Sequence, residues 1–380
     1  MFTSNYPFYQ PGKAALLSTP QRMRASKKYS GRGVVIAFVD SGFYPHPELA
    51  GRVLAHVDAS TQHVVEQDGH DFAPCDLSWH GQMTSVIAAG DGSHSSGRYR
   101  GIASDARLVL VRVSTPKGLI KEQDILRGLR WLLDTHRRFN VRVVNISVGG
   151  DFVSADPDHP LHKAVRKLTE AGVVVVCAAG NRAVDHVLPP ASAAEAITVG
   201  GLDDQNTLDQ SLWRAYHSNY GAACDQQPKP DILAPAMWVA GPIMPETTVA
   251  REARWLGPLL KAKDSKHIVR VLKKGYADLG IARDHALNPD DHLYSVLQAR
   301  INAHKIVDTH HQYVDGTSVA APIVSSVIAQ MLEANPRLTP AQIRSILCAT
   351  GKPLSNVPVE RQGAGVIQAA QAVTLAERFS

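Results

Sequence analysis

Three segments of this 380-residue chain carry side chains suited to nucleophilic catalysis. Asp40 follows the apolar run Val34–Val39, and a carboxylate that leaves a buried strand is poorly solvated unless it is paired. His80 opens one apolar helical pattern, and Ser318 lies in the first turn of another. A serine nucleophile needs a base within hydrogen-bond reach, and that base needs an acid to orient it. The sequence therefore contains the three residue types that such a relay requires.

Each segment also has an ordinary structural interpretation. A DSG tripeptide is usually a turn, a histidine that starts a helix is often a cap or a surface group, and GTS before a helix is a common N-cap. The catalytic hypothesis is favoured because all three segments are expected at the edge of one sheet. A fourth segment, Ala178–Asn181, ends another buried run, and the Asn181 amide there could donate to a developing oxyanion.

The segments that must position these side chains alternate between strand and helix patterns. Nearly continuous apolar runs predict strands buried on both faces of a parallel sheet. These runs are Val34–Val39, Leu108–Val113, Val141–Ile146, Val173–Cys177 and Ala196–Val199. Helical periodicity lies at Gly81–Ala89, Glu122–Phe139, Leu161–Ala171, Val319–Ala334 and Pro340–Ala349. The alternation predicts an α/β fold with a doubly wound, mostly parallel sheet.

The motifs around these segments resemble those of the subtilisin-like serine peptidases, the subtilase family. In chain order they are VDSG, HPEL, HGQMTSVIAAG, NISVGG, AAGN, KPDILAPA, GTSVAAP and the closing GAGVIQAAQAV. They fall within residues 31–240 and 312–375. The order Asp, His, Ser along the chain is the order in subtilisin. The resemblance implies a subtilisin-like fold and a serine endopeptidase that works through an acyl-enzyme intermediate.

The resemblance also implies a role for each matching residue. Ser318 would attack the scissile carbonyl, His80 would carry the proton, and Asp40 would fix the imidazole tautomer and stabilise its cation. Asn181 and the backbone N–H of Ser318 would hold the oxyanion. The residues implied to contact the substrate peptide are Gly118, Leu119, Ile120, Ser147, Val148, Gly149, Ala178, Ala179 and Gly180. The small walls of the implied specificity pocket predict a neutral or apolar side chain before the scissile bond.

The chain departs from the family pattern at several positions. Val319 stands where relatives commonly carry Met, and Ala236 stands where they usually carry Gly. Asp40 lies too near the first residue to leave room for a folded pro-domain, so folding without one is expected. No cofactor is expected to be required. Structural calcium is common in the family, but the loop 91–100 lacks a ligand-rich pattern, so no metal ligands are assigned.

One segment interrupts the alternation of strands and helices. Residues 245–307 contain three helical patterns and no strand pattern, which predicts a helical insertion before the nucleophile helix. The expected organisation is an N-terminal extension at 1–30 and a peptidase domain at 31–380 that this insertion interrupts. Residues 251–285 hold nine Lys and Arg against four Asp and Glu. The family places this region beside the leaving-group half of the cleft, so the insertion is expected to select flexible or acidic substrates.

Composition limits the other classes of function. Hydrophobic residues make up 44% and charged residues 20%, which excludes disordered, collagen-like and coiled-coil proteins. The net charge of +5 comes without a long basic run, so no nucleic-acid partner is expected. No signal-peptide pattern or apolar membrane span is evident, and four scattered cysteines suit a reducing compartment. We expect a cytoplasmic protein with a protein or peptide substrate and no membrane partner, and leave its oligomeric state open.

Two other interpretations remain open from the sequence. The same acyl-enzyme chemistry would serve an exopeptidase or a peptide ligase if the insertion closed one end of the cleft. An inactive binding protein on the same frame is less favoured, because Asp40, His80 and Ser318 are all present. A zinc site is also disfavoured, because there is no HExxH motif and His70, Cys75 and His80 have no recognised ligand spacing.

Overall fold

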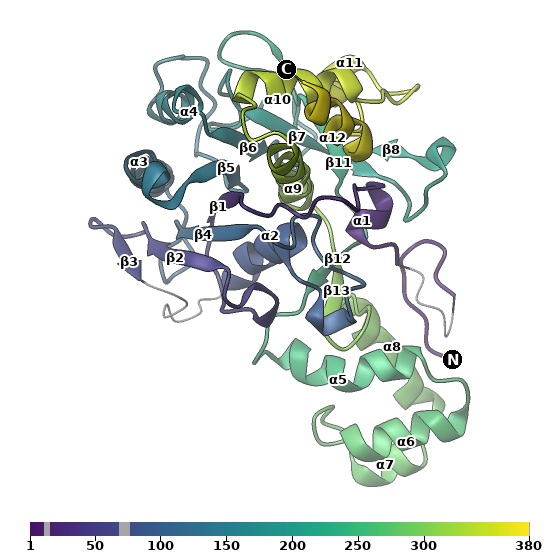
Figure 1. The fold of residues 1–380 in the computed structure, drawn as a ribbon. Coiled ribbons are helices and arrows are strands. Elements are labelled where there is room, and N and C mark those ends of the chain that lie inside the picture. The colour runs from purple at the N-terminus through teal and green to yellow at the C-terminus, as the bar shows by residue number, and fades with distance from the viewer. Residues whose placement is uncertain (11–15, 68–76, 380) are drawn as a thin grey trace.

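One large sheet organises the molecule. The structure is a computed structural model that describes residues 1–10, 16–67 and 77–379, and in this part of the chain nine strands form that sheet (Figure 1). The strands lie in the order β11 (Ile232–Pro235), β7 (Ile197–Asp203), β6 (Val174–Ala178), β5 (Val141–Ile146), β1 (Val35–Asp40), β4 (Arg107–Arg112), β2 (Val53–Asp58) and β3 (Val65–Gln67), with β8 (Arg214–Ala215) beside β7. Strands β3 and β8 are antiparallel to their neighbours, and the other pairings in this sheet are parallel. The predicted α/β fold with a mostly parallel sheet is therefore confirmed.

Alternate residues of the central strand β1 face opposite sides of the sheet. Ile36 and Phe38 belong to the apolar core on one side, and Val35, Ala37 and Val39 belong to the core on the other. All five side chains are fully buried. A strand covered on both faces buries the side chains on each of them, which explains the continuous apolar run before Asp40.

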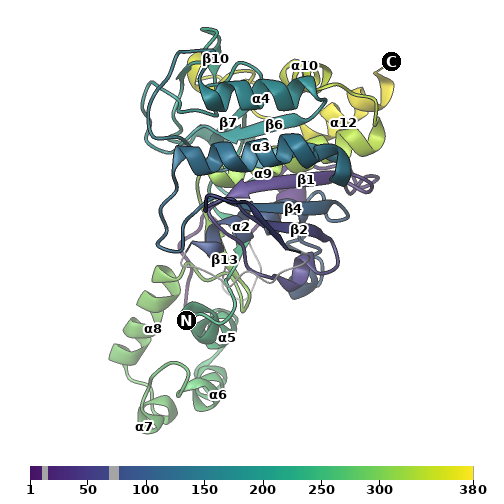
Figure 2. The ribbon, with the colours of Figure 1, turned by 90° about the vertical axis from the view of Figure 1, so that its left-hand side faces the viewer.

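Helices cover both faces of the sheet. One face carries α3 (Glu122–Phe139) and α4 (Pro160–Glu170), which lie in front of the sheet in Figure 2. The other face carries α2 (Ser78–Ala89), α9 (Thr317–Ala334), α10 (Pro340–Thr350) and α12 (Ala369–Arg378). Of the described helices, only α9 is long and apolar enough to cross a membrane, but 89% of it is buried inside the protein. This helix is the core helix of the sheet domain.

A helical lobe extends from the sheet domain, as Figure 1 shows. Its helices are α5 (Thr248–Leu260), α6 (Ser265–Gly275), α7 (Arg283–Leu287) and α8 (Asp291–Ala303). They enclose an apolar core of their own, in which Leu256 and Leu272 are fully buried. An antiparallel ribbon of β12 (Val239–Pro242) and β13 (His311–Val314) leads the chain into and out of the lobe. The sequence indicated three helices here, and the five-residue α7 is too short to show a periodic pattern.

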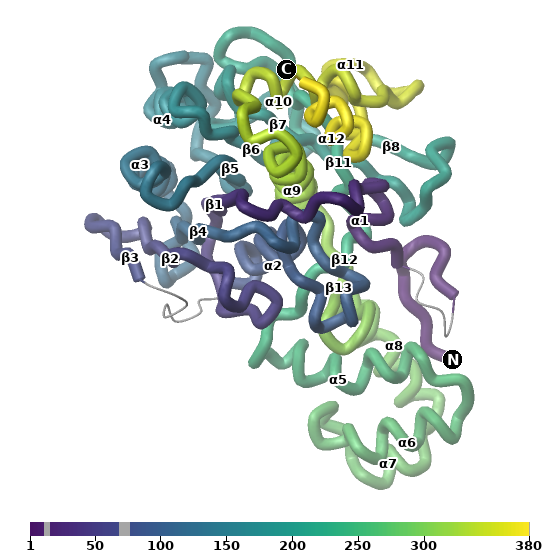
Figure 3. The backbone as a smooth tube through the Cα atoms, in the orientation of Figure 1, coloured from purple at the N-terminus to yellow at the C-terminus, as the bar shows by residue number. Residues whose placement is uncertain are grey.

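The N-terminal residues contact both the lobe and the sheet domain. Phe2 packs into the lobe core, and the Tyr9 hydroxyl donates to the Leu260 carbonyl at 3.1 Å. Farther along, the short helix α1 (Thr19–Arg22) lies against the sheet domain, and the tube in Figure 3 shows this course. Short elements complete the described chain: α11 (Val359–Gln362), the pair β9 (Gly221–Ala222) and β10 (Pro228–Lys229), and 3₁₀ turns at Pro47–Leu49, Ser93–Ser95 and Gln210–Leu212.

Candidate active site

A carboxylate and an imidazole meet at the carboxyl end of β1. Asp40, the last residue of the strand, is fully buried, and the first turn of α2 places His80 Nδ1 2.6 Å from Asp40 Oδ1. The Ser41 backbone N–H donates to the same oxygen at 2.7 Å. The Thr84 hydroxyl, one turn farther along α2, donates to Asp40 Oδ2 at 3.0 Å. These contacts satisfy a charged group that burial alone would make unstable.

The glycine after His80 allows α2 to approach the end of β1 this closely. A Cβ at Gly81 would overlap the carbonyl oxygen of Gly42, in the turn that follows Asp40. A larger residue at this position would push the helix away from the strand. Gly81, the second residue of the HGQMTSVIAAG motif, is therefore a condition for the contact between His80 and Asp40.

The Asp40 charge controls the protonation of His80. Burial acts to lower the pKa of His80, because it disfavours the imidazolium. The negative charge of Asp40 and its hydrogen bond outweigh burial and raise this pKa above its ordinary value. A carboxylate at Nδ1 also keeps a proton on that nitrogen, so Nε2 of the neutral ring is the free acceptor.

Ser318 and His80 line one cleft of about 430 Å³. Ser318 is the second residue of α9, and the side chains that follow it are buried in the core through Leu332. An N–H in the first turn of a helix has no acceptor within the helix, so the Ser318 N–H is available to a ligand. The buried body of α9 thus fixes a hydroxyl and a backbone donor at the rim of the sheet.

The Asn181 amide is oriented by the residue before the serine. Asn181 Oδ1 accepts the Thr317 backbone N–H at 2.8 Å and the Thr317 hydroxyl at 2.9 Å. Both contacts occupy the oxygen, so Nδ2 is directed elsewhere. A Cβ built on Gly316 would lie 3.4 Å from Asn181 Nδ2, 3.1 Å from Ser318 Oγ and 3.8 Å from Ser318 N. The space beside Gly316 therefore faces the hydroxyl and two N–H donors together, as an oxyanion site requires.

Six of the residues predicted to bind peptide line this cleft. They are Ser147, Val148, Gly149, Ala178, Ala179 and Gly180. Gly118, Leu119 and Ile120 are not among the described residues that line it. Ile120 forms a bridge with Ser114, and the Leu119 side chain is 58% exposed. The described lining also includes no residue of the 245–307 insertion.

The sequence did not indicate several polar residues of the cleft. Asp151, Arg182, His186 and Asn219 also line it, so its described walls are less uniformly neutral than the small residues suggested. Asn219 forms hydrogen bonds with two other residues that line the cleft, Gly180 and Arg182. Its N–H donates to the Gly180 carbonyl at 2.9 Å, and its Oδ1 accepts the Arg182 N–H at 2.7 Å. No pattern could reveal this role, because Asn219 lies in an irregular segment between β8 and β9.

The described residues contain no group of three or more His, Cys, Asp or Glu side chains arranged to hold a metal ion. Near the loop 91–100, the His94 ring packs against two other histidine rings, and Glu48 Oε1 accepts the His94 backbone N–H at 3.2 Å. Calcium needs six or more oxygen ligands, and these imidazoles do not fit it. His70 and Cys75, considered as zinc ligands, lie outside the described residues.

Comparison with known protein families gives a match over most of the chain. The model of the Subtilase family (Peptidase_S8) matches residues 31–365. Serine protease AprX from Bacillus subtilis (strain 168) is 28% identical over 361 residues, which cover 92% of this chain and 68% of AprX. Subtilisin-like protease 3 from Pseudogymnoascus destructans is 32% identical over 222 residues, covering 56% of this chain and 47% of that protein. The chain thus spans about half the length of this second relative.

Solved structures show the same fold. Fervidolysin from Fervidobacterium pennivorans superposes with a TM-score of 0.62 and 20% identity, covering 96% of this chain and 47% of fervidolysin. The protease domain of PatA superposes with a TM-score of 0.61 and 21% identity, covering 93% of this chain and 99% of that domain. At these identities the structural likeness supports the fold alone.

Proposed function

This chain belongs to the subtilase family of serine proteases, and from that premise we propose that it is an endopeptidase with Ser318 as its nucleophile. His80 is the proposed general base, Asp40 its orienting acid, and Asn181 the side-chain donor to the oxyanion. The observation that carries the proposal is the 2.6 Å contact between Asp40 and His80, at a cleft that also holds Ser318 and Asn181.

In the proposed acylation step, Ser318 Oγ forms a bond to the carbonyl carbon of the substrate. His80 Nε2 takes the hydroxyl proton as that bond forms, and the Asp40 charge stabilises the imidazolium. The carbonyl oxygen becomes an oxyanion beside Gly316, where Asn181 Nδ2 and the Ser318 N–H donate to it. Loss of one such donor typically costs about 3–4 kcal/mol of transition-state stabilisation.

Collapse of the tetrahedral adduct breaks the carbon–nitrogen bond. The imidazolium of His80 gives its proton to the leaving amine, and the acyl group stays on Ser318 as an ester. Water then attacks the ester while His80 takes one of its protons. A second collapse returns the proton to Ser318 Oγ and releases the carboxylic acid. No step of this proposal requires a cofactor or a metal ion.

The substrate is proposed to bind as an extended peptide. An extended chain can pair its N–H and C=O groups with the backbone of another extended segment, and Ser147–Gly149, which follow β5 and line the cleft, are proposed to supply that segment. Ala178–Gly180 at the end of β6 would form the wall beside the side chain that precedes the scissile bond. Gly118–Ile120 are proposed to contact the same peptide from outside the described cleft.

A fluorophosphonate probe tests the nucleophile directly. We expect wild-type protein to be labelled at neutral pH, with or without a chelator, and Ser318→Ala to remain unlabelled. Ser326→Ala is a matched control, because Ser326 is a buried serine of the same helix whose hydroxyl donates to the Ile323 carbonyl at 2.7 Å. Folded wild-type protein that resists the probe would contradict the proposal.

The products distinguish an endopeptidase from its alternatives. Mass spectrometry of a digested peptide library should show cuts within the peptides, each of which yields two shorter fragments. Cuts confined to one or two residues from a chain end would identify an exopeptidase. Products longer than the starting peptides would identify a ligase.

A further inference from the structure

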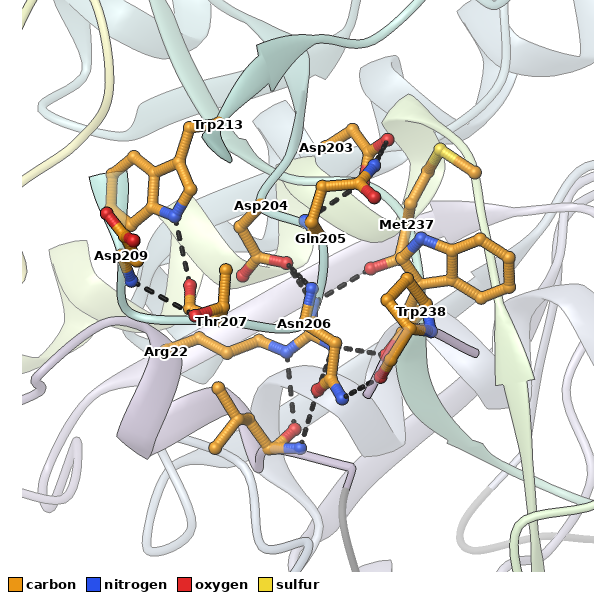
Figure 4. Close-up of polar contacts among 12 residues, drawn as sticks. Arg22, Asp203, Asp204, Gln205, Asn206, Thr207, Asp209, Trp213, Met237 and Trp238 are labelled. Atoms are coloured by element: carbon orange, nitrogen blue, oxygen red, sulfur yellow. Dashed lines mark hydrogen bonds and ion pairs between the residues drawn. The ribbon is translucent and has the colours of Figure 1, made fainter. Parts of the chain in front are cut away.

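A buried arginine of the N-terminal extension binds three separate segments of the chain (Figure 4). Arg22 is the last residue of α1, and its side chain is completely shielded from solvent. Its Nη1 forms an ion pair of 2.9 Å with the buried Asp204. Its Nη2 donates to Asn206 Oδ1 at 3.3 Å, and its Nε donates to the Leu17 carbonyl at 3.2 Å.

The remaining two donors of Arg22 bind consecutive backbone carbonyls. Nη1 donates to the Met237 carbonyl at 2.8 Å, and Nη2 donates to the Trp238 carbonyl. A guanidinium carries five N–H donors in a fixed plane, and the five contacts account for all of them. All five N–H donors of Arg22 are therefore occupied, and none is available to a ligand.

The Met237 and Trp238 carbonyls that Arg22 binds belong to a strained turn. Trp238 has φ +58°, in the left-handed region, which costs energy for a residue with a side chain and persists only where the surroundings enforce it. The Trp238 ring packs against Tyr313 of β13, with ring centroids 5.3 Å apart. The Arg22 contacts to the carbonyls of Met237 and Trp238 hold both peptide groups of this turn in place.

The same turn supports the backbone that precedes the nucleophile. The Ala236 carbonyl accepts the Gly316 N–H at 2.8 Å, and Val239 pairs with Val314 in the ribbon of β12 and β13. Residues 236–239 therefore run beside residues 314–316, and Ser318 follows two residues later. Gly316 borders the space that faces Ser318 Oγ and Asn181 Nδ2.

We infer that Arg22 is a positioning residue for the nucleophile. It fixes the turn 236–238, this turn fixes Gly316, and Gly316 sets where Ser318 and the oxyanion space lie. The inference rests on the proposed role of Ser318. The N-terminal extension would then affect catalysis without contacting the substrate, since no described residue of that extension lines the cleft.

If Arg22 only stabilised the fold, its replacement would leave kcat of the folded protein unchanged, whereas a positioning role predicts a lower kcat. Kinetic measurements therefore distinguish the two roles. Arg22→Gln removes the charge and most of the donors, whereas Arg22→Lys keeps the charge beside Asp204 but cannot reach both carbonyls with a planar fork. The double variant Arg22→Gln/Asp204→Asn also removes the unpaired buried carboxylate, which is the main threat to folding. It tests positioning in a protein that has no unpaired carboxylate at this site.

Arg344→Gln is the matched control. Arg344 also pairs with a buried aspartate, Asp231, and donates to a backbone carbonyl, that of Ala194 at 2.6 Å. It lies on α10, and its polar contacts in the described part of the chain are to Ala194 and Asp231, not to residues 236–239 or 314–318. Its loss should lower the melting temperature and leave the turnover of the folded fraction unchanged.

Peptide hydrolysis is measured well below the melting temperature and normalised to active sites titrated with the probe. We expect kcat to fall about ten- to a hundredfold in both Arg22→Gln and the double variant, as misplacement of a catalytic group predicts, with a much smaller change in KM. Arg22→Lys should recover part of the loss. Unchanged kcat in the double variant, or a change in KM alone, would overturn the inference while the proposed function stands. An inactive wild-type protein would overturn both.

Discussion

The Asp40 carboxylate is bound on both oxygens and still leaves His80 able to accept a proton at Nε2. The Ser41 N–H donates to Asp40 Oδ1 at 2.7 Å and the Thr84 hydroxyl donates to Oδ2 at 3.0 Å, so both oxygens of the buried carboxylate have hydrogen-bond donors besides the imidazole. The imidazole meanwhile keeps 21% of its surface exposed to the cleft. The pair is thus supported on its buried side and open on the side where substrate would arrive.

The pH dependence of activity tests this division of roles. In the proposed mechanism His80 must be neutral to accept the Ser318 proton, so kcat/KM should rise with pH through the His80 pKa, which Asp40 holds above its ordinary value. Asp40→Asn removes the charge and leaves burial, which lowers the pKa. The acidic limb of the profile should therefore move to lower pH, while the plateau falls about 10⁴-fold because the tautomer is no longer fixed.

Thr84→Val is the control for that experiment. It removes one hydrogen bond from Asp40 Oδ2 and leaves the carboxylate charged beside His80. Its acidic limb should stay close to that of the wild-type protein. An acidic limb of Asp40→Asn at or above the wild-type position would show that the Asp40 charge does not set the His80 pKa.

Residue types and order could be predicted from the sequence, but side-chain orientation could not. Asn181 was identified because it ends a buried strand. That its oxygen faces Thr317 and its nitrogen faces the Gly316 space depends on two contacts between segments 136 residues apart. Arg22 gave no signal either: three of its five acceptors are backbone carbonyls that any residue type provides, and the side-chain acceptors Asp204 and Asn206 lie 182 and 184 residues away in the sequence.

At the scale of elements, prediction followed the strength of the local pattern. The strand β5 and the helix α3 have the predicted bounds, because long apolar runs and a clear amphipathic face specify them. Helix α10 begins after the Thr339 cap, with Gln342 completing a capping box. Strand β2 was missed, because it is only partly buried and its sequence places His56 within the apolar run. Short or half-exposed elements depend on tertiary contacts that a local pattern does not contain.

The sequence also did not reveal the contact between the N-terminal tail, residues 1–10, and the helical lobe. Phe2 is 3% exposed, and its ring centroid lies 5.7 Å from that of Tyr294 on α8. Phe2→Ala should destabilise the lobe by about 3–5 kcal/mol, the usual cost of emptying a buried aromatic site. Hydrogen exchange should therefore accelerate in α5 and α8 and remain unchanged in the central strands.

Phe8→Ala is the matched control for that prediction. Phe8 belongs to the same tail, but its side chain is 59% exposed. Its replacement should leave exchange in the lobe unchanged. Equal exchange rates in the two variants would show that the lobe is stable without the tail.

At the scale of the whole molecule, the lobe is inserted into a hairpin of the protease. Pro242 and His311 are paired in the antiparallel register of β12 and β13, so the chain leaves and re-enters the sheet domain at adjacent points. The nine Lys and Arg side chains of residues 251–285 are all exposed on this lobe. No lobe residue lines the described cleft, so any effect of this charge on substrate choice acts at long range.

Replacing the lobe by a turn tests that long-range effect. Joining Pro242 to His311 through Asn-Gly closes the ribbon with a two-residue hairpin, and residues 1–10 are removed because Phe2 would lose its core. We expect short neutral peptides to be cut at the wild-type rate, while the predicted preference for acidic, flexible substrates is absent from this variant. In the wild-type protein the predicted preference should weaken as salt rises, since the screening length falls to about 8 Å at physiological ionic strength.

A charge variant distinguishes an electrostatic effect of the lobe on substrate choice from a steric effect of its bulk. Lys266→Gln/Lys273→Gln/Lys274→Gln keeps the helix α6 and removes three exposed cations from it. If charge selects the substrate, this variant should lose part of the acidic preference and its salt dependence, with the set of cleaved neutral peptides unchanged. If bulk selects it, only the turn variant should cut a broader set of folded proteins. A peptide-library profile identical among wild-type protein and both variants would remove the lobe from substrate selection altogether.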